Sequence, residues 1–474
     1  MTTTATVEPA KTPALSKKRK SASALPPSPY SLPVALQKGD ILTRGSAVVF
    51  GLGNMVRGQV VKGILFLAVE VLFIWLLIRS GLGCIGGLGD IGPVTEGGQQ
   101  WVDGELVVVS QTESVKRLLY GLCWVVIVVA FVVFWTMVVR SAYKAQVLRQ
   151  KTGRAPSFVD DIKDIFDSRI QISMMSLPTL GILVFTIMPL IFMISMAFTT
   201  FDNHHQTAFK WAGLENFGKV FSTTGTADIG VNIKLFGTVL AWTLVWAFLA
   251  TFLNFFLGMF VTMVILRKGT RFKSLWRILF SMSIAVPQFV SLLVINRMLQ
   301  DQGIVNQMLK NWGWIDSSIP FWSNEWWARG TVIVVNLWVG IPYTIMQITG
   351  ILQNIPAELY EASKIDGASW WQTFVEITMP YIFFVMTPYL ITTFTSNVNN
   401  FNVIYLLSGG APTPVGDSAG KTDLLITWLY KLTVDKKNYN VGAVIGILIF
   451  IVLAVVALVT YRSSGSYKNE EGFR

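Results

Sequence analysis

Residues Glu361 to Pro380 read EASKIDGASWWQTFVEITMP, a mostly polar stretch between two long apolar segments. Polar groups are costly in lipid unless they find partners there, so this stretch is expected at one face of a membrane. Pro356, just before it, is suited to start a helix, and Gly367 within it permits a bend. A small apolar face along that helix is expected from Ala362, Ile365 and Ala368. The stretch is therefore predicted to be a surface helix that a soluble protein can bind.

The apolar segments on either side belong to a set of about eight, each near the roughly 20 helical residues that cross a hydrocarbon core. Hydrophobic residues make up 52% of the chain and charged residues 14%, against about 25% charged in ordinary soluble domains. Barrel strands would be shorter and would alternate in polarity, so we predict an all-α, polytopic transmembrane helical bundle. The expected spans are Val60–Arg79, Leu118–Val139, Met174–Phe198, Phe236–Leu266, Ile278–Ile295, Thr331–Leu352, Tyr381–Leu407 and Val441–Tyr461.

The net charge of +11 is distributed by loop and does not indicate a nucleic-acid partner. Basic residues gather before the first span, in the second loop (residues 140–169) and in the fourth loop (residues 267–273), whereas the first loop is acidic. The positive-inside rule assigns the basic loops to the cytoplasm. Both termini are then expected inside, and parity of the spans places the loop with Glu361 there as well.

The run IPAELYEASKIDGA (Ile355 to Ala368), a phenylalanine six residues later and a closing ITMP resemble the coupling motif of permease subunits of binding-protein-dependent ABC importers. The match is to the sugar branch of that family, in which this cytoplasmic helix docks into a cleft of the ATPase subunit. The resemblance implies that the glutamate at 361 faces basic groups of the ATPase and that the glycine at 367 shapes the bend. A plain polar connector is the alternative. The coupling residues expected from the resemblance are Glu361, Ala362, Asp366 and Gly367.

Eight spans with this motif between the sixth and seventh resemble the larger membrane subunit of maltose and maltodextrin importers. Some members carry a large domain between the third and fourth spans, and only residues 199–235 lie there in this chain. We predict a disordered basic tail and cytoplasmic flank (1–58) that contacts anionic lipid, an N-terminal two-span module (59–167) and a six-span ABC importer core (168–474) with the coupling helix at 355–380.

The seventh span contains ITTFTSNVNNFN (Ile391 to Asn402), whose polar residues at i, i+3, i+4 and i+7 lie on one helical face. Uncharged hydrogen-bonding groups buried in a span need partners, which either a sugar or neighbouring helices can supply. In the sixth span Gly340 allows a ligand to approach the backbone, and Tyr343 can stack on a sugar. In maltose importers the corresponding positions line the sugar site, although the residue types at 393 and 396 differ there. The expected substrate-binding residues are Gly340, Tyr343, Thr393, Ser396, Asn397 and Asn400.

The sequence predicts no catalytic residue, no metal site and no cofactor. GDSAGKT (Gly416 to Thr422) is similar to a phosphate-binding loop, but Val415 occupies the position of its first glycine, so a turn-rich external surface loop is expected. His204 and His205 are adjacent without other metal ligands nearby in sequence. Glu70, within the first span, is expected to have a structural partner or to face lipid in protonated form.

The predicted function is that of a permease subunit of an ATP-driven, binding-protein-dependent importer of oligosaccharides, with maltose and malto-oligosaccharides ahead of galactose-containing oligosaccharides. The resemblance implies three partners, namely a second permease subunit, a dimer of ATPase subunits that hydrolyses ATP, and an extracellular sugar-binding protein. It also implies a bacterial plasma membrane, and the segment 408–425 with the C-terminal SYKNEEGFR resembles Gram-positive members. An ion-coupled secondary transporter is the alternative, but the core spans lack the carboxylates such coupling uses.

Overall fold

A computed structural model describes residues 30–92, 98–102, 105–109, 114–167, 170–206, 208–223, 230–267 and 269–463. The chain forms two compact units, the first made of residues 1–83 and 123–182 and the second of residues 84–122 and 183–474. The predicted division at residues 58 and 167 stays a prediction. Of the predicted tail, residues 1–29 lie outside the described residues.

Unit 1 begins with the predicted cytoplasmic flank, which folds into three short helices, α1 (Leu32–Lys38), α2 (Ile41–Gly45) and α3 (Leu52–Val56). They are tied to the second span, because the buried Arg57 donates hydrogen bonds to the backbone oxygen of Ala142 and to Asp40. The unit continues with α4 (Val60–Leu76) and the π-helical turn η1 (Leu77–Gly81), and later includes most of α6 (Ser114–Thr152), α7 (Phe158–Phe166) and α8 (Ile170–Ile182).

Glu70 lies on α4 and is buried. Its carboxylate accepts a hydrogen bond of 2.8 Å from the backbone N–H of Phe50. This contact agrees with the structural partner expected for that residue.

Unit 2 opens within α5 (Leu82–Gly86), whose first two residues belong to unit 1. An antiparallel hairpin of β1 (Gly98–Val102) and β2 (Glu105–Val109) follows, which the sequence did not predict. It then contains η2 (Leu183–Ile187), α9 (Met188–Met196), α10 (Glu215–Phe221) and α11 (Ile233–Leu266). The remaining elements are α12 (Lys273–Ala285), α13 (Gln288–Met298), α14 (Ile304–Asn311), α15 (Glu325–Gln353), α16 (Ala357–Ile365), α17 (Trp370–Thr373), η3 (Phe374–Thr378), α18 (Met379–Val398), α19 (Phe401–Leu407), α20 (Leu425–Tyr430), η4 (Lys431–Asp435) and α21 (Tyr439–Ser463).

Within the described residues, seven helices or helix series are long and apolar enough to cross a membrane, and counting one bent pair as a span makes eight. The prediction of an all-α polytopic bundle is confirmed. The fifth span is sharply bent, since α12 and α13 meet at an angle of 86°. Pro287 stands at this break, where a proline lacks the N–H that would continue the helix.

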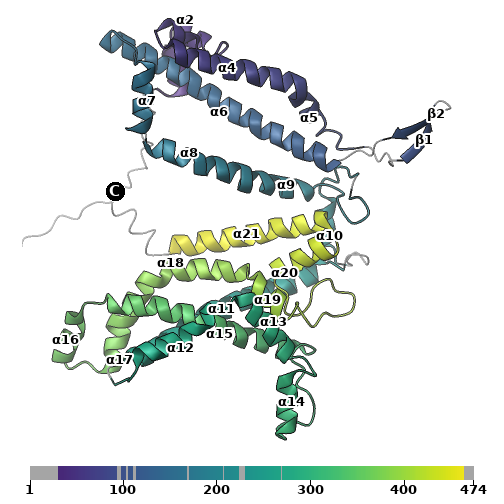
Figure 1. The fold of residues 1–474 in the computed structure, drawn as a ribbon, viewed down its shortest axis with the longest axis vertical. Helices are drawn as coiled ribbons and strands as arrows, with labels where there is room; N and C mark the ends of the chain where they lie inside the picture. The colour runs from purple at the N-terminus through teal and green to yellow at the C-terminus, as the bar shows by residue number, and fades with distance from the viewer. Residues whose placement is uncertain are drawn as a thin grey trace, which may run out of the picture. The chain divides into compact units, whose positions relative to one another are not determined.

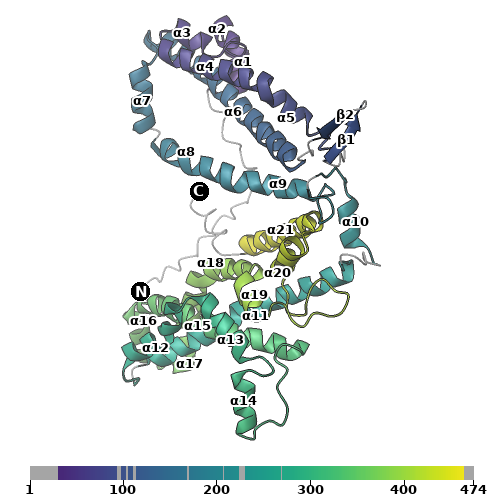
Figure 2. The ribbon, with the colours of Figure 1, turned by 45° about the vertical axis from the view of Figure 1, so that its right-hand side comes forward.

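Three loops of unit 2 and the start of the sixth span meet at one end of its helices. The side chain of Trp211 donates a hydrogen bond to the backbone oxygen of Leu88, and this contact joins the third loop to the first. Asn440 donates to Asn216, and this contact joins the seventh loop to the third. Arg329, at the start of the sixth span, donates to Lys421 of the seventh loop. Helix α16 lies at the opposite end of unit 2 from α10 and α20 (Figures 1 and 2).

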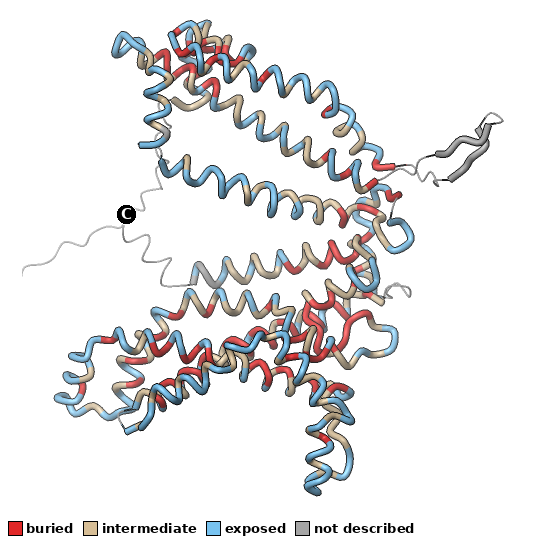
Figure 3. The backbone as a smooth tube through the Cα atoms, in the orientation of Figure 1, coloured by how far each residue is buried: buried red, intermediate tan, exposed pale blue. Residues whose placement is uncertain are grey.

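The core of unit 2 lies where α11 packs against α15 and α18. Along α11 the buried side chains include Trp246 and Phe255, and α15 contributes Ile345 and Ile348. Figure 3 shows buried residues throughout these helices, whereas the outer faces and the segment around α16 are exposed.

Candidate functional site

The predicted coupling helix forms as α16 and ends in a tight turn at Gly367. Pro356 precedes its first residue, as expected. At its end the N–H of Ala368 donates to the oxygen of Ser363 and the N–H of Gly367 donates to the oxygen of Lys364. This is a Schellman motif, which needs a left-handed residue after the helix. Gly367 supplies it with a φ of +73°, so the predicted bend is present for a definable backbone reason.

The chain after this turn folds back along α16. Ser369 caps α17 through reciprocal hydrogen bonds with Gln372. Two side-chain contacts then join the segments, Tyr360 to Thr378 at 3.1 Å and Thr373 to Ser363 at 3.3 Å. These contacts hold α16 as a defined projection.

The outward face of α16 carries the residues predicted to dock. Ile365 is 86% exposed, which is unusual for an isoleucine on a polar helix. A small apolar surface flanked by carboxylates is therefore available to a partner, and Figure 3 shows this projection as exposed. All four predicted coupling residues are also exposed: Glu361, Ala362, Asp366 and Gly367.

A second group of predicted residues joins α11 and α15 to the C-terminal end of α18. Asn397 of α18 donates a hydrogen bond of 3.0 Å to Thr251 of α11, and Asn400 donates to Asn397 at 3.3 Å. One turn beyond Thr251, Asn254 lies against Gly340 of α15. We call Thr251, Asn254, Gly340, Asn397 and Asn400 the central polar cluster.

Gly340 serves helix packing in this structure. A Cβ built on Gly340 would lie 2.5 Å from the Nδ2 atom of Asn254, closer than real contacts allow. Four residues on, Thr344 occupies the matching space beside Gly258 of α11. The Asn254 side chain occupies the space beside the glycine, and the approach of a ligand to Gly340 stays a prediction.

Asn254 and Thr251 were missed from the sequence. The Oδ1 atom of Asn254 is buried and has no hydrogen-bond partner among the described residues, while its Nδ2 donates to the backbone of Ala250. An unpartnered amide oxygen is costly inside a protein, so a ligand or water is expected to bind it. The available signal was two polar residues three apart near the middle of a mostly apolar helix.

The predicted polar face of the seventh span is interrupted. Helix α18 ends at Val398, and Asn400 begins α19 by accepting a hydrogen bond from the N–H of Val403. The expectation of one continuous helical face through Asn400 is therefore wrong. An asparagine side chain competes for backbone N–H groups, which favours the start of a new helix over continuation of the old one.

The other three predicted substrate residues lie apart from these hydrogen bonds. Tyr343 is 49% exposed, Ser396 is exposed and Thr393 is partly buried. No hydrogen bond of these three side chains is found within the described part of the chain. Their assignment to a sugar site stays a prediction.

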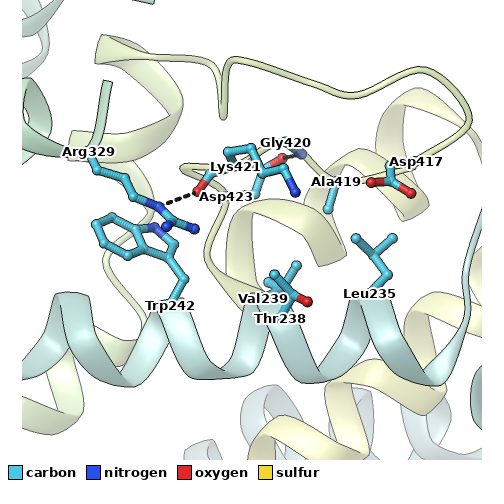
Figure 4. Close-up of a pocket in the computed structure, with 10 residues that line it drawn as sticks. All are labelled: Leu235, Thr238, Val239, Trp242, Arg329, Asp417, Ala419, Gly420, Lys421 and Asp423. Carbon is cyan, nitrogen blue, oxygen red and sulfur yellow. Dashed lines mark hydrogen bonds between the residues drawn. The ribbon is translucent and has the colours of Figure 1, made fainter. Parts of the chain in front are cut away.

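The loop that is similar to a phosphate-binding motif is packed into unit 2, contrary to the surface loop that we expected. Asp423 is fully buried and accepts hydrogen bonds from the Gly420 N–H at 2.7 Å and from Lys431 Nζ at 2.6 Å. Figure 4 shows Gly420 and Lys421 folded over α11, with Arg329 donating to the Lys421 oxygen and lying 4.4 Å from the Trp242 ring. The loop covers one end of the bundle. A phosphate-binding loop follows directly after a β-strand, and helix α19 precedes this loop instead.

Comparisons with known proteins fit this geometry. Residues 254–464 match the family described as binding-protein-dependent transport system inner membrane component. The galactooligosaccharides transport system permease protein GanP of Bacillus subtilis is 33% identical over 429 residues, which cover 90% of this chain and 97% of GanP. The maltodextrin transport system permease protein MdxF of the same organism is 30% identical over 436 residues, 90% of this chain and 96% of MdxF.

Among solved structures, a bacterial ABC transporter involved in the import of the acidic polysaccharide alginate has a chain of the same fold, with a TM-score of 0.53 and 21% identity. That match covers 63% of this chain and 96% of the other. Near-complete alignment to relatives at 30% identity or more, together with the seven helices of the described residues that are long and apolar enough to cross a membrane, establishes a multi-pass membrane protein. The chain is a member of the family of inner-membrane permease components of binding-protein-dependent transport systems.

Proposed function

We propose that this chain is one of two membrane subunits of an ATP-driven oligosaccharide importer and that α16 is the site at which a separate ATPase subunit binds. The observation that carries the proposal is the exposed projection of α16, with Glu361 and Ile365 on its surface. ATP hydrolysis belongs to that ATPase dimer, since the GDSAGKT segment of this chain is packed around Asp423. A second permease and an extracellular sugar-binding protein complete the assembly.

The substrate that we propose is an uncharged oligosaccharide. The central polar cluster offers amides and hydroxyls without a charged side chain, and the Asn254 Oδ1 atom is left to accept a hydrogen bond. Sugar hydroxyls satisfy such groups, whereas an amino acid or phosphate would favour a fixed opposite charge. The relatives named for maltodextrin and galactooligosaccharide transport support this class, and we propose malto-oligosaccharides, with galactose-containing oligosaccharides as the second candidate.

The transport cycle follows from these two sites. Closure of the ATPase dimer moves α16, which is tied to η3 and hence to α18 through Tyr360 and Thr378. Because Asn397 of α18 bonds Thr251 of α11, movement of α18 changes the central polar cluster. The cluster then accepts the sugar from the binding protein when it faces outward and releases it when it faces the cytoplasm. In this orientation both termini and α16 lie in the cytoplasm, and the membrane is that of a Gram-positive bacterium.

Competition for uptake tests the substrate. Proteoliposomes that contain the full importer take up radiolabelled maltotriose, and unlabelled sugars are added in excess. We expect maltotetraose to compete and amino acids and phosphate not to compete. Stronger competition by a galactosyl trisaccharide would assign the second candidate, and competition by amino acids or phosphate alone would overturn oligosaccharide transport.

A further inference from the structure

A cavity of about 480 Å³ lies within unit 1, between α4, α6 and α7. This volume falls in the range of about 300–1,000 Å³ that is usual for ligand sites. Its lining has an apolar part and a polar part, in which three basic side chains lie together with Asp161. The basic side chains are Lys62, Arg140 and Lys144, and the apolar side chains include Phe66, Phe134 and Met137.

The two parts follow the depth of the membrane. Lys62 is the last charged residue before the apolar run of α4, and Arg140 is the first charged residue after the apolar run of α6. Phe66 lies one turn inward from Lys62, and Met137 lies one turn inward from Arg140. The cavity therefore has cationic groups at the boundary of the hydrocarbon and aromatic and aliphatic groups inside it.

Helix α7 closes the cavity and has two different faces. Asp161 and Asp164 face the basic residues, with Asp161 2.8 Å from Lys62 and Asp164 3.8 Å from Lys144. The other face is apolar and exposed, formed by Val159, Ile162 and Phe166. An amphipathic helix of this kind lies in the interfacial region of a bilayer, with its apolar face against acyl chains.

The basic side chains retain unused hydrogen-bonding capacity. The Lys62 ammonium has three donors, of which Asp161 takes one. At 3.8 Å the Lys144 pair is longer than a hydrogen bond. Arg140 uses its Nε to bind the Tyr30 oxygen, and its terminal nitrogens have no other hydrogen bond among the described residues. Among the described residues of this site, three cations lie beside two carboxylates, an excess of one positive charge that is available to a ligand.

We propose that this cavity binds an anionic glycerophospholipid of the phosphatidylglycerol type. The phosphodiester carries a single negative charge, which matches the unmatched cation and the donors of Arg140 and Lys144. One acyl chain extends along Phe66 and Met137. Basic pockets between helices at the membrane boundary are a recognised way to bind such headgroups. The site gives the N-terminal module a role that is separate from substrate transport.

Native mass spectrometry of the purified full importer tests this site, with dioleoyl-phosphatidylglycerol and dioleoyl-phosphatidylcholine offered in equal amounts. We expect wild type to retain phosphatidylglycerol in preference. The double variant Arg140→Gln, Lys144→Gln should lose at least about fivefold in apparent affinity, since each basic group near an anionic lipid surface contributes about that factor. The matched control Lys38→Gln, Lys151→Gln removes the same charge from exposed positions of unit 1 outside the cavity and should bind as wild type does.

Three results would overturn the proposal. Equal retention of the two lipids would remove the headgroup preference, and equal losses in both double variants would indicate general electrostatic attraction. Displacement of the lipid by sn-glycerol 3-phosphate alone would indicate a site for a soluble phosphate. If the double variant fails to assemble, the single variant Arg140→Gln, at an exposed position, is measured instead and must retain less phosphatidylglycerol than wild type.

Discussion

At Asp423 three hydrogen bonds converge on a carboxylate with no exposed surface, from the Gly420 N–H, the Thr427 hydroxyl and the Lys431 ammonium. A buried pair of this kind is costly to break, because the remaining partner stays charged without compensation. We therefore regard Asp423 as the residue that holds the seventh loop to α20 and η4, with no part in nucleotide binding.

Asp423→Ala should destabilise the protein by about 3–5 kcal/mol, the usual cost of removing one partner of a buried ion pair. The expected readout is a lower melting temperature in detergent. Asp435→Ala is the matched control, since Asp435 is exposed, and it should melt as wild type does. Equal melting of the two variants would show that the Lys431 contact has no structural weight.

Asn397 has two possible roles, and its partner Thr251 separates them. Asn397→Leu removes the amide, and Thr251→Val removes only the hydroxyl that the amide binds. If Asn397 binds sugar, Asn397→Leu should lower apparent sugar affinity about two- to tenfold, from a lost bond of about 0.5–1.5 kcal/mol, while Thr251→Val, which leaves the amide of Asn397 in place, should have the smaller effect. Sugar titration of ATPase activity gives the affinities. Equal effects of the two substitutions, with lower melting temperatures, would assign Asn397 to packing alone.

At the scale of the element, α16 has an exposed face and ends in a defined turn at Gly367. Reversal of charge by Glu361→Lys should abolish ATP-driven uptake and co-purification of the ATPase, because basic groups are expected opposite this glutamate. The matched control is Asp316→Lys, an exposed acid in the loop that follows α14, away from α16. If Glu361→Lys retains both the ATPase and uptake, α16 is only a connector.

The turn that ends α16 gives an independent test of the same element. Proline holds φ near −65° and has no N–H, so Gly367→Pro is incompatible with the φ of +73° and removes the bond to Lys364. Asparagine adopts left-handed conformations, and nothing lies within 4 Å of a Cβ at this position. We expect the ATPase to be lost on purification of Gly367→Pro and to co-purify with Gly367→Asn. Equal binding of the ATPase by both variants would show that docking does not depend on this turn.

The elements could be predicted from sequence where backbone chemistry decides them. Pro356 lies just before α16 and Gly367 just after it, as expected, and the length of the apolar segments located the spans. The proline at 287 indicates a break in the fifth span, whereas the break between Asn399 and Asn400 was not predicted, because there a single competing amide ends the helix. In the candidate site, the spacing of polar residues singled out Asn397 and Asn400, although the continuous helix on which that spacing relied ends at Val398. Asn254 was not singled out, since its importance comes from contact with Gly340 of another helix.

For the whole molecule, the loops joined at the end of unit 2 opposite α16 make the topology testable. In a variant without Cys84 and Cys123, Asp316→Cys should react in intact cells with a thiol reagent that does not cross membranes. Asp366→Cys, beside Gly367, should react only after the membrane is opened. Both positions are exposed, so reactivity reports the side of the membrane. Labelling of both in intact cells would contradict a cytoplasmic α16.

The central claim is that ATP drives an oligosaccharide through this chain. The most direct measurement is uptake of radiolabelled maltotriose by proteoliposomes that contain the full importer and its sugar-binding protein, with ATP, its non-hydrolysable analogue or an imposed ion gradient as the energy source. We expect uptake against a concentration gradient only with hydrolysable ATP and only with the binding protein present. Uptake that follows an ion gradient without ATP would contradict the account.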